Sequence, residues 1–262
     1  MKLCGEYVII TLLNLKDREV DYLKLIADTH SHTLVSGHAY NTIREMVQAA
    51  ASKGIKLFAI TEHAPEMPGT CAQIYFENLN IIPREMEGIQ VLFGAEVNIL
   101  DEEGNIDLYP ELCERLDIVI ASIHGPCFHA EHTKEAVTQA YLNVMEKPYI
   151  NVIGHPDDAR FPVDAESLVK KAKETNTLIE VNNSSLTPGG FRIDTHGTML
   201  NILKLCKQYQ VPVTTSSDAH VDVDAGNLTY VYQILEECEF PEELVVTTES
   251  EKIKPYLNKY KK

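Results

Sequence analysis

The chain has 262 residues, of which 44% are hydrophobic and 24% are charged. This composition is typical of a globular protein with enough apolar material for a core, and it excludes a disordered chain. The formal net charge of −16 disfavours a nucleic-acid or anionic-membrane partner, because either surface would add more negative charge. The six cysteines have no Cys-x-x-Cys spacing, which excludes a zinc knuckle and favours a reducing compartment.

Residues 1–20 are the least informative part of the sequence. Their apolar run, residues 7–13, is short and has no small-residue cleavage site after it, so a signal peptide is disfavoured. No stretch approaches the ~20 apolar residues of a transmembrane helix. We expect a cytoplasmic protein in which residues 1–20 form an N-terminal extension. Residues 21–262 contain no linker-like stretch and are expected to form a single domain.

From residue 22 onward, apolar strand-like runs alternate with helical segments. Seven strands are predicted, over residues 23–27, 57–60, 91–95, 118–123, 152–154, 178–181 and 212–215. Helices are predicted over residues 42–53, 133–145, 164–173, 197–209 and 228–237, and an amphipathic tail is expected around residues 253–260. This α/β alternation predicts a parallel sheet, here closed into a barrel, with the carboxyl ends of the strands on one face.

Residues able to bind a metal ion follow six of the seven predicted strands. His30 and His32 are one residue apart, so in an extended chain both side chains point to one side and can reach one ion. The other candidates are His38, His63, Glu96, His124, His155, Asp218 and His220. Any one histidine could be an ordinary core-edge residue, but their joint placement at strand ends favours a metal centre. Nine ligands are too many for one ion.

These motifs, in this order, resemble the PHP (polymerase and histidinol phosphatase) superfamily. The residues that carry the resemblance include Asp28-Thr29-His30-Ser31-His32, Thr61-Glu62-His63, Gly94-Ala95-Glu96, Gly154-His155-Pro156 and Ser217-Asp218-Ala219-His220. The closest branch is that of the small stand-alone PHP phosphatases with a trinuclear zinc site. The resemblance implies a distorted (β/α)7 TIM-like barrel. Glu62 stands where many members have Asp, a departure that would affect the surroundings of the ligands.

The resemblance also implies how the ligands are shared among three divalent ions. One ion would be held by His30, His32, Glu96 and Asp218; Glu96 would bridge to a second held by His124 and His155; the third would be held by His38, His63 and His220. Imidazole and carboxylate ligands suit Zn²⁺ best, and they also suit Mn²⁺ or Fe²⁺.

The resulting hypothesis is a metal-dependent phosphatase that hydrolyses phosphate monoesters of small molecules. A metal-activated water would attack phosphorus, with Glu96, Asp218 and His220 as the catalytic residues that hold the metals. Asn182, Asn183 and Arg160 are candidates for binding the substrate, and structural roles for these three are left open. A homo-oligomer is also left open.

Three other functions are weighed against this hypothesis. A phosphodiesterase or exonuclease of the same superfamily would need a basic groove for a polynucleotide, and the net charge disfavours such a groove. A diesterase that acts on a small nucleotide is left open. Amidohydrolases also begin a barrel with His-x-His, but usually place a lysine on the fourth strand, where this sequence has His124. A non-catalytic metal-binding protein is less favoured, because three ions offer about fifteen coordination positions and nine residues fill about ten.

Overall fold

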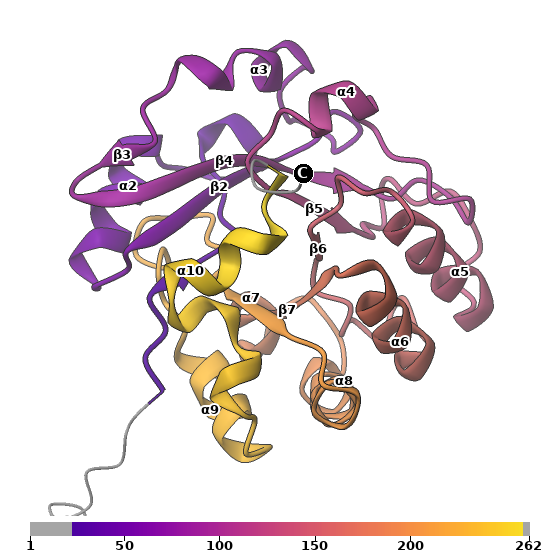
Figure 1. The fold of residues 1–262 in the computed structure, drawn as a ribbon. Helices are drawn as coiled ribbons and strands as arrows, with labels where there is room; N and C mark the ends of the chain where they lie inside the picture. The colour runs from indigo at the N-terminus through magenta and orange to yellow at the C-terminus, as the bar shows by residue number, and fades with distance from the viewer. Residues whose placement is uncertain (1–22, 259–262) are drawn as a thin grey trace, which may run out of the picture.

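The structure is a computed structural model that describes residues 23–258. Its central feature is a curved sheet of seven parallel strands in the order β1-β2-β4-β5-β6-β7-β8 (Figure 1). These strands are β1 (Ala27–Asp28), β2 (Leu57–His63), β4 (Ile89–Asn98), β5 (Val119–Ser122), β6 (Val152–Ile153), β7 (Leu178–Asn182) and β8 (Val213–Ser216). A short β3 (Glu85–Met86) pairs antiparallel with β4. The predicted distorted (β/α)7 barrel is confirmed.

The longer helices surround the sheet on its outer side (Figure 1). They are α2 (Ile43–Ser52), α5 (Lys134–Met145), α6 (Ala165–Thr175), α8 (Thr195–Tyr209) and α9 (Thr229–Glu237), close to the predicted ranges. Local caps explain where two of them begin. Thr42 and Glu45 form a reciprocal capping box at the start of α2, and Asp164 accepts from the Ser167 amide at the start of α6.

Short helical turns fill the loops between these elements. They are α3 (Ile74–Glu77), α4 (Pro110–Cys113), α7 (Asn183–Leu186), α10 (Ser250–Ile253) and the 3-10 turns η1 (Leu34–Ser36), η2 (Leu79–Ile81), η3 (Glu242–Leu244), η4 (Val246–Thr248) and η5 (Lys254–Tyr256). The sequence patterns did not predict them, since four residues are too few to show helical periodicity.

One predicted element differs from the structure. The first strand was expected over residues 23–27, but its ladder with β2 begins only at Ala27. The amides of Leu25 and Ile26 donate instead to the Tyr232 hydroxyl at 3.0 Å and the Thr247 carbonyl at 2.9 Å. The expected amphipathic tail begins at the end of α10 and continues as η5, in which Pro255 has no amide hydrogen to continue an α-helix.

The predicted N-terminal extension, residues 1–20, lies outside the described residues, as do residues 259 and 260 of the expected amphipathic tail.

Strand alternation separates an interior core from an outer one. Along β2, Leu57 and Ala59 pack inside the barrel, whereas Phe58 and Ile60 pack in the layer shared with the helices. Since side chains alternate along a strand, His63 falls on the interior side, beyond the apolar residues. The floor of the barrel is therefore apolar, and the carboxyl end of the same column is polar.

The same column on β4 leads to a buried carboxylate. Leu92 packs in the interior core, Gly94 follows two residues later, and Glu96 comes next on that side. Gly94 leaves room for close strand contact, because a Cβ there would lie 2.0 Å from the Ile118 carbonyl oxygen. The register of β4 thus delivers Glu96 to the mouth of the barrel.

Hydrogen bonds between the two end strands bring the barrel close to closure. Thr29 donates its amide to the Thr215 carbonyl at 3.4 Å, and the loop after β1 continues to pair with the loop after β8. The Asp218 amide donates to the His30 carbonyl and the His32 amide to the Ala219 carbonyl, each at 2.9 Å. These hydrogen bonds between the loops after β1 and β8 form a seam, and they place the two loops side by side.

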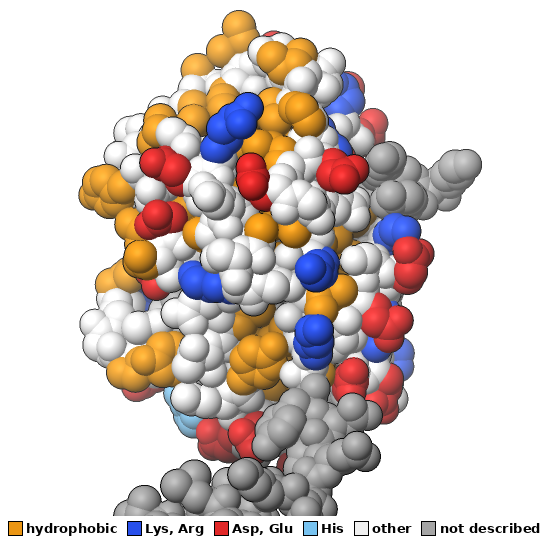
Figure 2. All heavy atoms as spheres, turned by 90° about the vertical axis from the view of Figure 1, so that its left-hand side faces the viewer, with side chains coloured by type: hydrophobic (Ala, Val, Ile, Leu, Met, Phe, Trp, Pro, Cys, Tyr) orange, Lys and Arg blue, Asp and Glu red, His pale blue; other side chains and the backbone are white. Residues whose placement is uncertain are grey.

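The surface has a mixed character. Acidic and basic side chains are interspersed with apolar ones on the face drawn in Figure 2. Within residues 23–258, no helix combines the length and apolarity needed to cross a bilayer.

The seam depends on Asp28, and its loss should destabilise the fold. Asp28 accepts from the amides of Ser217 and Gly226, both at 2.9 Å, from the amide of His30 at 3.4 Å and from the Ser217 hydroxyl at 2.6 Å. In Asp28→Ala these buried donors lose their acceptor, so we expect the free energy of unfolding to fall by about 3 kcal/mol. Urea unfolding of metal-free protein measures it.

Asp28→Asn serves as the graded control, because it keeps one acceptor oxygen and should lose less stability than Asp28→Ala. A loss below about 1 kcal/mol in Asp28→Ala would show that the seam does not depend on this carboxylate.

Candidate metal centre

All nine side chains predicted to bind metal lie together at the mouth of the barrel. Glu96 is at their centre and is completely buried. Its Oε1 lies 2.9 Å from His155 Nε2 and 3.3 Å from His124 Nε2. Its Oε2 lies 2.6 Å from His63 Nδ1 and 3.4 Å from His30 Nε2. One carboxylate therefore faces imidazoles that follow β1, β2, β5 and β6.

Asp218 closes the cluster on the side of the seam. Its Oδ1 lies 3.3 Å from His32 Nε2, and 3.7 Å from both His30 Nε2 and His220 Nδ1. His220 in turn places its Nε2 3.1 Å from His38 Nε2. Asp218 has a φ of +54°, so its backbone adopts the left-handed conformation that turns the chain after β8.

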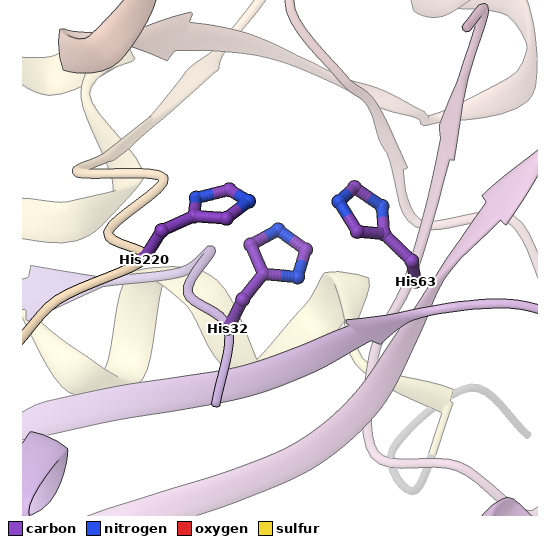
Figure 3. A group of neighbouring side chains, drawn as sticks. All are labelled: His32, His63 and His220. Carbon is purple, nitrogen blue, oxygen red and sulfur yellow. The ribbon is translucent and has the colours of Figure 1, made fainter. Parts of the chain in front are cut away.

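Three trios within the cluster have their ligand atoms close enough to hold an ion. They are His32, His63 and His220; His30, His32 and Glu96; and His63, Glu96 and His124. Figure 3 shows the rings of the first trio arranged around a shared space. His32, His63 and Glu96 each belong to two trios, which suits ligands shared between neighbouring ions.

Two buried atoms support a cation in this space. Glu96 Oε2 and His63 Nδ1 are only 2.6 Å apart, yet neither makes a hydrogen bond of acceptable geometry to any described residue. Buried polar atoms are almost always satisfied, so two of them directed at each other indicate a missing shared partner. Imidazole and carboxylate donors fit a divalent transition metal.

The ionisation states suit metal binding as well. Burial alone would raise the pKa of Glu96, but the histidines around it, His124 first, hold its pKa well below the usual value. Burial lowers the pKa of His32 well below its usual value, and His63 and His220 lower it further. Ionised carboxylates and neutral imidazoles are the forms that coordinate metal.

His30 differs because a second carboxylate lies behind it. Burial would lower its pKa, but Glu180, Glu96 and Asp218 together raise it well above the usual value. Its Nδ1 lies 2.7 Å from Glu180 Oε1, while Nε2 faces the cluster. With the Nδ1 proton held by Glu180, a cation can replace the proton on Nε2.

Glu180 and its neighbours form a supporting layer that the sequence interpretation missed. Glu180 also accepts from the Ser216 hydroxyl at 2.5 Å, from the His155 amide at 2.7 Å and from the Asn182 side chain at 3.1 Å. Its position between Leu178 and Asn182 on the interior side of β7 was the available signal, because a polar residue there must find partners.

Similar contacts orient two more histidines. His32 Nδ1 is 3.2 Å from the Ser36 hydroxyl, which donates to Glu62 at 2.5 Å. His124 Nδ1 lies 2.7 Å from Asn98 Oδ1. Glu62, the departure noted from the sequence, therefore acts behind His32.

Arg192 is the second residue that the sequence interpretation missed. Its side chain is only 6% exposed, and its guanidinium donates to Asp218 Oδ2 at 3.1 and 3.2 Å and to the Ser185 hydroxyl at 3.1 Å. Asn182 donates to the same Oδ2 at 3.2 Å. Oδ2 is thereby occupied, and Oδ1 is left facing the histidines. No periodic pattern marks an arginine in the Gly-rich loop before α8.

The substrate-binding candidates from the sequence have separate places. Asn182 supports Asp218, as described above. Asn183 Oδ1 accepts from the Tyr230 amide at 2.8 Å and so holds the start of α9. Arg160 lines the wall of the cavity beside the cluster, without contact to the nine ligand candidates among the described residues. That cavity has a volume of about 820 Å³.

Comparison with known proteins places this site in a family. The profile described as PHP domain matches residues 28–188. The chain belongs to the PHP domain family. It is 43% identical over 235 residues to a probable phosphatase of Clostridium novyi (strain NT), covering 90% of this chain and 95% of the relative. A probable phosphatase of Caldanaerobacter subterraneus is 42% identical over 240 residues, which cover 92% and 94% of the two chains.

Among solved structures, this PHP chain is similar to a histidinol phosphate phosphatase from Lactococcus lactis, solved with zinc, L-histidinol and phosphate. The TM-score is 0.59 at 18% identity, covering 82% of this chain and 94% of the other. At this identity the likeness establishes the shared fold.

Glu180→Gln should weaken metal binding while leaving the nine candidate ligands in place. The NH2 group of a glutamine would face either the donors at Oε2, from His155 and Asn182, or those at Oε1, from His30 and Ser216. The hydrogen bonds that orient His30 and His155 could not all form. We expect metal affinity to fall about 10- to 100-fold. Competition with a chromogenic chelator measures it. Glu174→Gln, on the exposed side of α6, is the matched control, and equal affinities in the two variants would contradict the role of Glu180.

Arg192→Gln should make metal binding more sensitive to acid. Burial would raise the pKa of Asp218, but His30 and Arg192 hold it well below its usual value, so removing Arg192 raises it. The carboxylate then takes up a proton at higher pH, and we expect metal loss on acidification to begin about one pH unit higher. Metal content after dialysis across a pH series measures the shift. An unchanged release curve would contradict it.

Proposed function

We propose that this PHP protein is a metal-dependent phosphatase that hydrolyses phosphate monoesters of small molecules at three divalent ions, most favourably Zn²⁺. The observation that carries the proposal is the buried carboxylate of Glu96, which lies between imidazoles from four strands. Its Oε2 has no hydrogen-bond partner among the described residues. The phosphatase names of its relatives support the same reaction class.

The charges of the site favour a phosphoryl group. Divalent ions at the cluster would outweigh the two carboxylates of Glu96 and Asp218, so an acidic protein would carry a locally cationic mouth. The oxygen atoms of a phosphate monoester are the strongest anionic ligands for such a centre. The cavity above the cluster can contain a small organic leaving group.

When bound, the metal ions would polarise the phosphoryl oxygens and acidify a water for in-line attack. The protein's part is to keep the ligands fixed and correctly ionised. Arg192 and Asn182 hold Asp218 Oδ2, so that Oδ1 stays directed into the cluster. Glu180 keeps the proton of His30 on the nitrogen remote from the cluster. Such preorganisation spares reorganisation during the reaction.

Protein nucleophiles near the site are poorly suited to the attack. Cys127 is buried after β5, and burial raises the pKa of its thiol to about 12, so it stays protonated at neutral pH. The Ser217 hydroxyl donates to Asp28 at 2.6 Å and belongs to the seam. A water nucleophile fits these two residues better than a covalent intermediate.

The decisive experiment compares a chromogenic phosphate monoester with its matching diester. We expect the monoester to be the better substrate, with turnover lost when metal is stripped and restored by Zn²⁺ or Mn²⁺. A diester preference would favour the phosphodiesterase alternative. Tight metal binding without turnover of either ester, or of a panel of small phosphates, would favour the non-catalytic alternative.

His124→Ala links turnover to the cluster. Removing one imidazole beside Glu96 should lower metal content and monoester turnover together, turnover by at least about 100-fold. His196→Ala is the matched control, because His196 pairs with Glu237 on the exposed surface. Full activity and metal content in His124→Ala would contradict the assignment.

A further inference from the structure

Arg160 lines the cavity but takes no part in the cluster. Asp158 holds its guanidinium, with Arg160 Nε 3.0 Å from Asp158 Oδ1 and 2.9 Å from Oδ2, and with Nη2 also donating to Oδ2. The Arg160 backbone amide donates to Oδ1 at 3.1 Å. Although burial opposes its ionisation, these hydrogen bonds lower the pKa of Asp158, so the pair is ionic.

This pairing uses only one edge of the guanidinium. The planar group presents five N–H donors, and a carboxylate on the Nε–Nη2 edge leaves the Nη1–Nη2 edge available for a second oxyanion. The Arg160 side chain keeps 38% of its surface exposed, and no hydrogen bond from Nη1 to a described residue is found. Arg192, by contrast, is 6% exposed and committed to Asp218 and Ser185.

Two phenylalanine rings lie near the Arg160 guanidinium. Its Cζ lies 5.8 Å from the ring centroid of Phe161 and 5.1 Å from that of Phe191. Phe191 is 68% exposed, although such large apolar side chains are usually buried, which suits a position beside a bound ligand. An arginine side chain that Asp158 already holds along one edge loses less entropy on binding an anion than a free one.

Asp158 also ties together the loops that form this wall. The Ile193 amide donates to Asp158 Oδ1 at 3.3 Å, and the Ala159 amide donates to the Ile193 carbonyl at 2.9 Å. The loop after β6 and the loop after β7 are thereby joined at Arg160. The free edge of its guanidinium therefore has a defined place on the wall of the cavity.

We propose that the physiological substrate carries a second anionic group, a carboxylate or a second phosphate, on its leaving group, and that Arg160 binds it. This inference rests on the proposed phosphatase function, which assigns the first phosphoryl group to the metal centre. A substrate with a single phosphate would leave the guanidinium edge to water. A doubly anionic substrate would fill both cationic sites of one cavity.

The test measures binding rather than turnover. Three series of non-hydrolysable phosphonates are compared on the metal-loaded protein by calorimetry: alkylphosphonates, ω-carboxyalkylphosphonates and alkylene diphosphonates of matched chain length. We expect at least one doubly anionic ligand to bind about 10-fold or more tightly than the alkylphosphonate of equal length. The two doubly anionic series distinguish a carboxylate from a phosphate as the second group.

Variants then assign the preference to Arg160. In Arg160→Gln the affinity ratio between doubly and singly anionic ligands should fall to about one, and Arg160→Lys, which keeps the charge without the planar edge, should be intermediate. Arg44→Gln, at an exposed position on α2, controls for the loss of one positive charge and should keep the preference.

Two results would overturn the inference: equal affinities across the series in the unaltered protein, or an undiminished preference in Arg160→Gln. Failure of the proposed function would look different. In that case no phosphonate of any series would bind the metal-loaded protein. The inference of a doubly anionic substrate would then also be wrong, because it rests on the proposed function.

Discussion

The burial of the Glu96 carboxylate is the constraint on which the rest of the site depends. A buried carboxylate is costly unless cations or hydrogen-bond donors compensate it. Here its pKa stays well below the usual value, because histidines from four strand ends surround it. Burial lowers the pKa of His63, which disfavours its charged form, so this imidazole does not compensate the charge. A bound cation would complete the balance, which would explain how the barrel accommodates so polar a mouth.

The barrel makes this arrangement through strand alternation. Interior columns begin with apolar residues such as Leu57 and Leu92 and end with His63 and Glu96, so one register sets both the floor and the site. A slip of one residue on either strand would exchange the interior column with the outer one. Packing of the apolar floor therefore fixes the positions of the ligands, and stability and function share the same hydrogen-bond ladder.

The sequence was sufficient for the residues that belong to repeating patterns. The seven strands and the nine candidate ligands could be predicted because each ligand follows an apolar run, and the structure brings all nine together, although their division among ions stays a prediction. Glu180 and Arg192 escaped prediction for different reasons. Glu180 interrupts a strand and reads as an ordinary polar residue until the barrel closes around it. Arg192 lies in an irregular loop, where its contact with Asp218 depends on tertiary structure alone.

The first strand shows the same limit in the backbone. The apolar run over residues 23–27 has strand composition, but the partners of its early amides are Tyr232 and Thr247, more than 200 residues away. Local propensity cannot reveal such partners. The C-terminal residues Val246, Ile253 and Leu257 pack in the same interior core as Ala27, so the end of the chain takes the place that a longer first strand would have taken.

The two cavity arginines show how reaction and selectivity can be separated in this fold. Each is paired with an aspartate, but Arg192 is buried against Asp218 and acts on the metal centre, whereas Arg160 is held by Asp158 and keeps one edge free. The candidate ligands lie mostly at or just after strand ends. Asp158 and Arg160 lie on the loop after β6, where the candidate ligand is His155. Loop changes could therefore alter the leaving group that is bound without disturbing the charge balance around Glu96. Under these proposals, the barrel register would set the chemistry, and the contacts between two loops would set the choice of substrate.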